Sequence, residues 1–159
     1  MNIREARIDD YEGFLSVFKE IEKLHREFVN WKFRECDNEQ NIFPYEYYKK
    51  MVEKNNSNIY IFEFENKIVG LSMGEIVESK DIPVLKEREY LKIRTVGVLP
   101  EYRNKGIGNK LLKELENWAM SKGVYDFEID VYAFNNSALE FYKNNDFDVY
   151  LYGLRKSKN

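Results

Sequence analysis

Apolar residues recur along the first third of the chain with a helical period. A short strand is predicted over Asn2–Ile8, and either Asp9 or Asp10 can then cap a helix, because a short carboxylate accepts hydrogen bonds from free backbone N–H groups. The apolar stripe of that helix has a spacing of three to four residues: Phe14, Phe18, Ile21 and Phe28. A second helix is predicted to begin at Pro44 and to end near Asn55. The segment from Trp31 to Phe43 has no clear period.

The middle of the chain changes to strand patterns. Ile59–Glu65 and Lys67–Val77 flank a tight turn at Glu65-Asn66-Lys67, which predicts a β-hairpin. Another strand is predicted over Tyr90–Val98, followed by a turn with two glycines. The turn leads into a helix that ends at Gly123. One face of this helix is apolar: Ile107, Leu111, Leu112, Leu115, Trp118 and Ala119.

Three more elements are predicted after that helix. Asp126–Tyr132 has the pattern of a strand, and Asn135 or Asn136 can cap a short helix that runs to about Asn145. Phe147–Leu154 is predicted to form a last strand. The resulting order, β-α-α-β-β-β-α-β-α-β, predicts an α/β fold in which helices pack on a mixed sheet. No linker or repeat divides the chain, so residues 1–159 are expected to form a single domain.

Composition excludes several classes of protein. The net charge of −3 argues against electrostatic capture of nucleic acid, which needs a basic face. The chain has one cysteine, Cys36, so no intramolecular disulfide can form, and no Cys/His spacing predicts a metal site. No apolar run is long enough to cross a membrane, and the first residues are too charged for a signal peptide. We therefore expect a cytoplasmic protein without a metal.

The turn after the central strand has the features of a phosphate site. A strand, a turn with glycines and a helix bring unpaired backbone N–H groups and the positive end of a helix dipole to one place. Arg103 and Lys105 add positive charge there. We interpret Arg103–Gly108 as a cradle for a pyrophosphate group; the alternative is an ordinary strand-to-helix turn.

Other phosphate-binding motifs fit less well. The chain has no sequence of the P-loop type. A dinucleotide fingerprint would use Gly106 and Gly108, but Leu111 stands where that motif requires glycine or alanine. Glu128 and Asp130 lie about 20 residues further on, as that motif expects. Dinucleotide binding therefore stays as a weaker alternative.

Two motifs of the sequence resemble the GNAT superfamily of N-acetyltransferases. The segment V-x-P-E-Y-R-N-K-G-I-G, from Val98 to Gly108, is similar to the acetyl-CoA pyrophosphate motif of that family. The segment from Asn135 to Phe147 is similar to its second signature, N-x-x-A-x-x-x-Y followed by a phenylalanine. The resemblance implies a mixed, mainly antiparallel sheet that is splayed at the acetyl-CoA site, with helices on both faces.

The resemblance also implies which residues hold the acetyl-CoA. Backbone groups of residues 95–98, with Val96 and Val98 among them, would bind the pantetheine arm, and Asn135 would lie near that arm. The pyrophosphate would lie on the backbone N–H groups of six consecutive residues: Arg103, Asn104, Lys105, Gly106, Ile107 and Gly108. In one departure, Asp146 stands before Phe147 where the family usually has glycine, and we expect a changed helix C-terminus there.

Two side chains are candidates for the proton transfers. Tyr142 matches the family position that often protonates the departing CoA thiolate. Its helical spacing with Ala138 and Phe141 also fits a core aromatic residue. Glu75 is the candidate for the base that deprotonates the amine, because strand alternation puts it on an apolar side with Met73, where burial would favour the base role. Alternatively, it lies in water at the end of the strand.

Several other residues have weaker claims. His25, the only histidine, lies on the stripe of the first helix and is either structural or part of the lining of the acceptor site. Cys36 has no visible base partner and is interpreted as structural. The acidic residues of the connector could attract a cationic amine but are more typical of a solvated loop: Glu78, Asp81, Glu87 and Glu89.

The resemblance implies acetyl transfer from acetyl-CoA to a primary amine of a small molecule or peptide, by direct attack and without a metal. The alternative is a regulatory or sensor domain of the same fold that binds CoA without turnover. A homodimer is possible. Binding to nucleic acid or to a membrane is not expected, and the sequence does not identify the amine acceptor.

Overall fold

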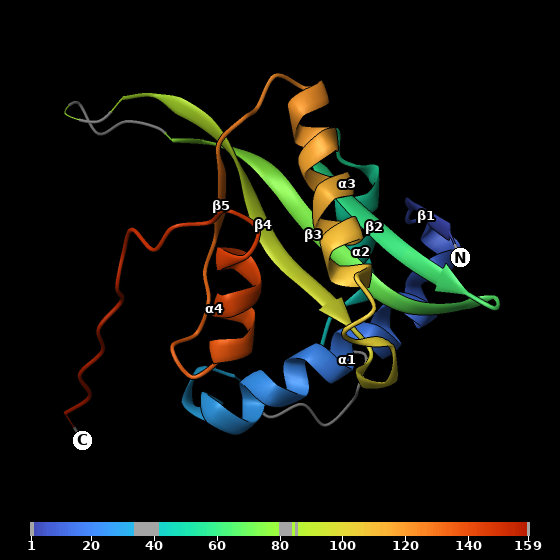
Figure 1. The fold of residues 1–159 in the computed structure, drawn as a ribbon, viewed down its shortest axis with the longest axis horizontal. Coiled ribbons are helices and arrows are strands. Elements are labelled where there is room, and N and C mark those ends of the chain that lie inside the picture. Colours follow the sequence, from blue (N-terminus) through green and yellow to red (C-terminus); the bar gives the residue numbers. More distant parts are fainter. Residues whose placement is uncertain (1, 34–41, 80–83, 85, 159) are drawn as a thin grey trace.

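A computed structural model describes residues 2–33, 42–79, 84 and 86–158 of the chain (Figure 1). The four α-helices of these residues are α1 (Tyr11–Phe28), α2 (Tyr45–Glu53), α3 (Ile107–Ser121) and α4 (Asn136–Lys143). The strands are β1 (Asn2–Glu5), β2 (Ser57–Phe64), β3 (Lys67–Ser79), β4 (Arg88–Val98) and β5 (Phe127–Ile129). Short 3₁₀ helices span Ile8–Asp10 (η1), Asn30–Lys32 (η2) and Pro100–Tyr102 (η4).

The strands form one mixed sheet in the order β1-β2-β3-β4-β5. The first four are antiparallel to their neighbours, and β5 is parallel to β4. The predicted hairpin is confirmed: Glu65 and Asn66 have φ angles of 49° and 61°, and two left-handed residues in a row are typical of the tight turns that suit twisted hairpins. The predicted mixed, mainly antiparallel sheet is therefore confirmed.

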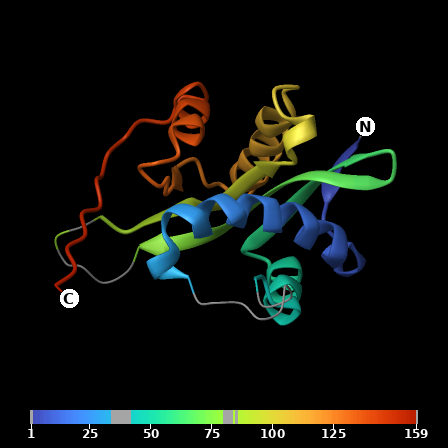
Figure 2. The same ribbon diagram turned by 90° about the horizontal axis from the view of Figure 1, so that it is seen from below.

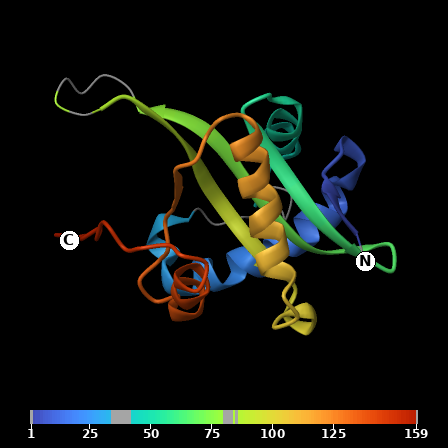
Figure 3. The same ribbon diagram turned by 45° about the horizontal axis from the view of Figure 1, so that its top comes forward.

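The two faces of β3 carry side chains of different size. Leu71 and Met73 are buried in the cluster with α1 and α2, whereas Gly70 and Gly74 face α3. A Cβ added at Gly70 would lie 3.0 Å from Leu111 Cδ1, so the missing side chain lets α3 lie close to the sheet. Figure 3 looks onto α3 as it lies across the strands.

Helices cover both faces of the sheet, as predicted (Figure 2). Helix α1 crosses β4 at Gly97, where an added Cβ would lie 2.1 Å from Ile21 Cδ1 and 2.5 Å from Ile21 Cγ1. Tyr142 of α4 packs in the same apolar cluster as Leu115 of α3. Helices α1 and α2 therefore cover one face, and α3 and α4 cover the other.

The contact of α1 with β4 gives a stability prediction. We expect Gly97→Ala to destabilise the protein by about 1–3 kcal/mol, because the added methyl group overpacks against Ile21. Ile21→Ala in the same chain should restore part of that loss, since it removes the atoms that collide. Urea denaturation of both single variants and the double variant measures this coupling; purely additive effects would contradict the crossing of α1 over β4.

The predicted last strand, Phe147–Leu154, is wrong. These residues form no strand, and the side chains of Tyr150, Leu151 and Tyr152 are 68%, 71% and 81% exposed. A segment with an alternating pattern becomes a strand only where a neighbour offers its backbone, and β5 is only 3 residues long. The segment instead contacts β5 through a side chain, since the Tyr150 hydroxyl donates a hydrogen bond to Glu128 Oε2 at 3.0 Å.

The beginning of α1 also differs in detail from the prediction. Asp10 is the N-cap residue of α1, but its side chain makes no capping hydrogen bond. Its carboxylate instead accepts hydrogen bonds from both terminal nitrogens of Arg4, at 2.7 and 2.8 Å, and from the backbone N–H of Arg7. The hydrogen bond from Arg4 is the main reason why the pKa of Asp10 lies below its usual value.

Candidate active site

The turn between β4 and α3, residues 103–108, has a backbone conformation that suits an anion, and it is called the anion turn below. Asn104 and Gly106 are both left-handed, with φ angles of 59° and 74°, and Gly106 is the N-cap of α3. No side chain caps this helix, and Lys110 N donates to Gly106 O, so the N–H groups of Ile107, Gly108 and Asn109 come before the first intrahelical bond. Backbone N–H groups at the positive end of a helix dipole favour a phosphate group. The turn can therefore hold a pyrophosphate, as the sequence predicts.

The two basic side chains of the turn lie against backbone carbonyls. Arg103 Nε donates a hydrogen bond to Val98 O at 2.9 Å, and Lys105 Nζ donates to Glu101 O at 3.0 Å. Both residues are exposed, and Lys105 Nζ also lies 5.3 Å from the centre of the Tyr102 ring. These contacts keep two positive charges at the rim of the turn, where an anion would arrive.

Glycine is required at the two positions of the motif for different structural reasons. Gly106 needs its left-handed conformation, and a Cβ there would meet no atom within 4 Å. At Gly108 a Cβ would lie 3.2 Å from Phe141 Cε2, so this glycine lets α4 approach the first turn of α3. The side chain of Ile107 is buried in the core, and only its backbone can serve a ligand. The sequence motif therefore combines an anion site with a helix-packing contact.

The sheet opens just before this turn. The pairing of β4 with β5 ends at Ile93 and Ile129, and in the described residues no strand pairs with β4 on that side over residues 94–98. A β-bulge at Arg94 accompanies the opening, because Gly74 pairs with Ile93 but Met73 pairs with Thr95. Residues 94–98 thus lie between the last β5 pair and the anion turn, and the predicted splay of the sheet is confirmed.

Val96 and Val98 lie in this stretch, which pairs with β3 but is unpaired on the β5 side. Their partners across β3 are Ser72 and Gly70, so both valines face α3. Both are half-buried and pack against the apolar core. Leu99 N donates to Val69 O of β3 at 2.9 Å, and backbone groups alternate along a strand, so those of Val96 and Val98 face the side from which β5 is missing.

Asn135 and Tyr142 lie on α4 beside the opening. Asn135 is the N-cap of α4, and its Oδ1 accepts hydrogen bonds from Ala138 N and Ser137 Oγ, both at 3.1 Å. The Tyr142 ring is 6% exposed and makes edge contacts with Phe141 and Phe147. Burial raises the pKa of Tyr142 above its usual value, so the hydroxyl stays protonated at neutral pH. A buried, protonated hydroxyl can act as a proton donor.

Asp146 replaces the glycine of the motif without changing the backbone that a glycine would adopt. It has a φ of 65°, in the left-handed region that short polar residues tolerate. Phe147 N donates to Tyr142 O at 3.1 Å and so closes the end of α4. This closure fixes Phe147 against the ring of Tyr142.

Glu75 lies on the α1 face of β3 and is engaged by a neighbour. Arg94 Nε donates a hydrogen bond to Glu75 Oε1 at 2.9 Å, and Arg94 also donates to the same oxygen through Nη2. The side chain of Glu75 is 17% exposed. The sequence did not predict Arg94 as its partner, because the bulge that brings the two together is not visible in a period of two. Both hydrogen bonds engage Oε1, so a proton on Glu75 would be accepted at Oε2.

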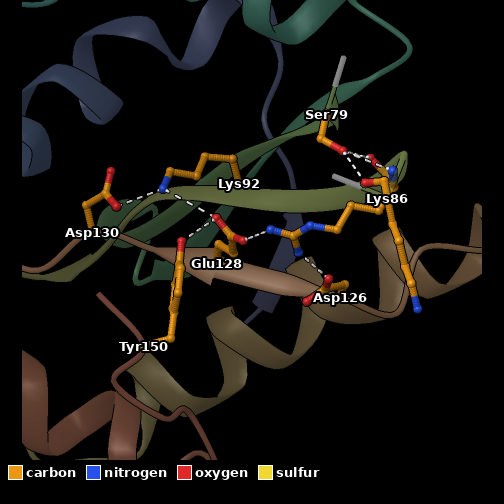
Figure 4. A network of polar contacts seen from close by, with 8 residues as sticks. Ser79, Lys86, Lys92, Asp126, Glu128, Asp130 and Tyr150 are labelled. Carbon is orange, nitrogen blue, oxygen red and sulfur yellow. Dashed lines mark hydrogen bonds and ion pairs between the residues drawn. The ribbon is translucent and has the colours of Figure 1, made fainter. Parts of the chain in front are cut away.

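The acidic residues that the dinucleotide alternative requires are paired with basic residues (Figure 4). Glu128 forms an ion pair with Arg88 and accepts the hydrogen bond of Tyr150, and Asp130 Oδ1 lies 2.8 Å from Lys92 Nζ. These carboxylates stabilise the edge of the sheet. Because they are engaged in these ion pairs, they are not available to bind the hydroxyl groups of a ribose.

His25 is part of an aromatic cluster that the sequence did not predict. Its Nδ1 lies 3.1 Å from Glu22 Oε1, and its ring lies 5.1 Å from that of Tyr132 and 6.2 Å from that of Phe134, between ring centres. Phe28 stacks on Phe134 at 4.6 Å. The only sequence signal for this cluster was the pair of aromatic residues just before Asn135.

Other predicted features have less to add. Cys36 and Asp81 lie outside the described residues. So do residues 34–41, which belong to the segment from Trp31 to Phe43 that has no clear period. Within the described ranges, no group of three or more His, Cys, Asp or Glu side chains could hold a metal ion. None of the helices described here has the length and apolar character to span a bilayer.

Comparisons with known proteins agree with this geometry. Residues 19–147 match the acetyltransferase (GNAT) family. An uncharacterized N-acetyltransferase of Archaeoglobus fulgidus is 24% identical over 146 residues, which cover 92% of each chain. The BH1408 protein of Bacillus halodurans has the same fold, with a TM-score of 0.91, 23% identity and full coverage of both chains.

A further solved structure with this fold is the aminoglycoside N-acetyltransferase AAC(6')-Iy in complex with CoA. Its TM-score is 0.77 at 13% identity, and the alignment covers 99% of this chain and 93% of that one. The family match extends over most of the chain, including the anion turn, the opening in the sheet and Tyr142. The chain belongs to the GNAT acetyltransferase family, which confirms the predicted fold and the predicted class of enzyme, an acetyl-CoA-dependent N-acetyltransferase.

Proposed function

We propose that this protein transfers the acetyl group of acetyl-CoA to a primary amine of a small molecule or peptide, by direct attack of the amine on the thioester. The observation that carries the proposal is the loss of the β5 partner after Ile93, directly before a turn whose N–H groups have no side-chain cap. Free backbone groups along a strand suit an amide-containing arm, and uncapped N–H groups suit its phosphates.

In the proposed complex the cofactor is held mainly by backbone. The N–H groups of residues 104–108 bind the pyrophosphate, with the side chains of Arg103 and Lys105 beside it. The backbone N–H of Arg103, which the sequence also assigned to this role, already donates to Pro100 O at 3.2 Å. The backbone of residues 95–98, including Val96 and Val98, binds the pantetheine arm, and Asn135 lies near that arm at the start of α4. A strand N–H around residues 96–98 holds the oxyanion of the tetrahedral intermediate.

The chemistry needs one proton donor and one proton acceptor. The nitrogen of the neutral amine attacks the thioester carbon, the C–N bond forms and the C–S bond breaks. Tyr142 gives its proton to the departing thiolate. Glu75 is the candidate that the sequence offers for the acceptor of the amine proton, either directly or through water, and Arg94 engages its Oε1 but not its Oε2.

A free-thiol assay against a panel of amines tests the proposed function. The panel contains an aminoglycoside, a polyamine, free amino acids and peptides with free N-termini or lysines. We expect thiol release that requires both acetyl-CoA and one class of amine. Saturable binding of CoA without thiol release for any amine would instead favour a regulatory or sensor domain. Self-association as a homodimer stays a prediction, which light scattering of the purified protein tests.

A further inference from the structure

We propose that His25, held by Glu22, accepts the proton of the attacking amine. This inference rests on the proposed function, since it names a residue for one step of that reaction. It concerns the α1 face of the sheet, whereas the anion turn and Tyr142 belong to the face covered by α3 and α4.

The position of α1 brings His25 to the opening in the sheet. Ile21 of α1 lies directly on Gly97, which belongs to the unpaired stretch of β4, residues 94–98. His25 lies one helical turn further along α1 and contacts the ring of Tyr132, three residues beyond the end of β5. The imidazole therefore bridges from the helix that crosses β4 to the chain that leaves β5. These are the two strands that separate at the opening.

Donor and acceptor of protons then lie on opposite sides of the reacting groups. Tyr142 packs with Leu91 and Ile93 of β4 on the α3 face and serves the sulfur of the cofactor. In the proposed reaction the amine attacks from the other face, opposite Tyr142 and the sulfur that it protonates. His25 is on that other face.

The pair formed by Glu22 and His25 has the geometry of an oriented base. Glu22 Oε1 lies 3.1 Å from His25 Nδ1, and the two side chains are 13% and 21% exposed, so the pair is shielded but within reach of a ligand. A carboxylate can only accept a hydrogen bond, so the proton of the neutral imidazole belongs on Nδ1. The lone pair is then on Nε2. The carboxylate also stabilises the imidazolium that forms when Nε2 takes up a proton.

The charged and titratable groups recorded around His25 are compatible with this role. They are Glu22 on its own helix, Tyr132 on the segment after β5, and Lys32 of η2 above the Tyr132 ring. Lys32 Nζ lies 5.0 Å from the centre of that ring, so the cation–π position on Tyr132 is filled by a residue of this chain.

The proton balance of the step is closed. The ammonium group of the acceptor gives one proton to His25 Nε2, and the neutral nitrogen then attacks the thioester carbon. Water accepts the second proton from the nitrogen as the tetrahedral intermediate collapses, Tyr142 protonates the thiolate, and the Tyr142 phenolate takes a proton back from water. His25 returns its proton to water after the products depart.

Activity measurements on three variants test the role of His25. In the free-thiol assay with the best amine of the panel, we expect His25→Gln to lower kcat/KM by about 100-fold at pH 7, the size typical of a lost general base. The loss should shrink at high pH, where the amine is neutral without help. Glu22→Gln should cost about 10-fold. Glu27→Gln removes the same charge from an exposed position on the opposite side of α1 and should leave kcat/KM unchanged.

A second readout separates positioning from mere packing. Because the chain has one histidine, its imidazole gives a single set of ¹⁵N NMR signals. We expect the Nδ1–H tautomer in the wild-type protein and in Glu27→Ala, and a shift toward Nε2–H in Glu22→Ala, which removes the hydrogen-bond acceptor. A wild-type tautomer in Glu22→Ala would overturn the orienting role of Glu22.

The outcomes distinguish this inference from the proposed function. Absence of thiol release from the wild-type protein with every amine would overturn the proposed function and the role of His25 with it. Turnover by the wild type with equal kcat/KM and pH profile in His25→Gln would overturn the role of His25 alone. In that second case a large loss in Glu75→Gln would assign the base to Glu75.

Discussion

Replacing Tyr142 by phenylalanine is expected to lower kcat by about 10- to 100-fold, the share that one positioned proton donor contributes. The variant keeps the ring and loses only the hydroxyl, so the contacts with Phe141 and Phe147 remain and the melting temperature should change little. Binding of CoA should also be retained, because the anion turn is not altered. Steady-state kinetics and calorimetry on the same preparation measure all three quantities.

Tyr125→Phe is the matched control for this variant. Tyr125 is 73% exposed at the far end of α3, and its hydroxyl should have no effect on turnover. If Tyr142→Phe has the kcat of the wild type, the donor role is wrong and Tyr142 is only a core residue.

The raised pKa of Tyr142 also predicts a pH dependence. Burial disfavours the phenolate, so the pKa in the folded protein is higher than the value of about 10 in the unfolded chain. The stability that comes from burying the neutral phenol is complete below pH 10 and is lost as the pH rises further. Turnover should therefore not decline through ionisation of this tyrosine up to pH 10. A pH series of kcat and of urea midpoints tests both statements.

Gly106→Val is expected to weaken CoA binding by at least 10-fold. A β-branched residue is disfavoured at a φ of 74° by about 1–2 kcal/mol, so the turn moves away from the conformation that aims its N–H groups. Hydrogen bonds to a charged group contribute about 1.5–3 kcal/mol each. The loss of one correctly directed N–H group therefore already accounts for a tenfold change in the dissociation constant.

Gly123→Val separates ligand binding from strain. Gly123 follows the other end of α3 with a φ of 82°, and a Cβ there meets no atom within 4 Å, as at Gly106. Both substitutions should therefore lower the free energy of unfolding by similar amounts, but only the one at Gly106 should weaken CoA binding. Equal affinity in the two variants would contradict the assignment of the pyrophosphate to this turn.

Elements defined by local chemistry could be predicted from the sequence. The hairpin follows from the turn at Glu65 and Asn66, and the start of α4 follows from Asn135, whose side chain does cap that helix. The anion turn follows from residues that are neighbours in the chain. In each case the residues that decide the structure lie within a few positions of one another.

Features that depend on distant residues could not be predicted. Phe147–Leu154 has a strand pattern, but β5 pairs only through Phe127–Ile129, so the segment finds no partner. The carboxylate of Asp10 is engaged by Arg4, which comes from the neighbouring strand β1. Each of these outcomes is decided by what a second element offers, and no period in one segment contains that information.

The candidate site shows the same division. The residues from Arg103 to Gly108 belong to the turn between the central strand and the following helix, as predicted. The partner of Glu75 depends on a bulge at Arg94, and the contact of His25 with Tyr132 joins the first helix to the end of the sheet. The sequence could therefore predict the local turn of the candidate site better than the contacts between its distant residues.

The most direct test of the central claim is a calorimetric titration of the wild-type protein with acetyl-CoA, with NADH and NADPH as parallel titrants. The account predicts saturable binding of acetyl-CoA that Gly106→Val weakens and Gly123→Val does not, and no binding of either dinucleotide. Binding of a dinucleotide in the absence of any acetyl-CoA binding would contradict it.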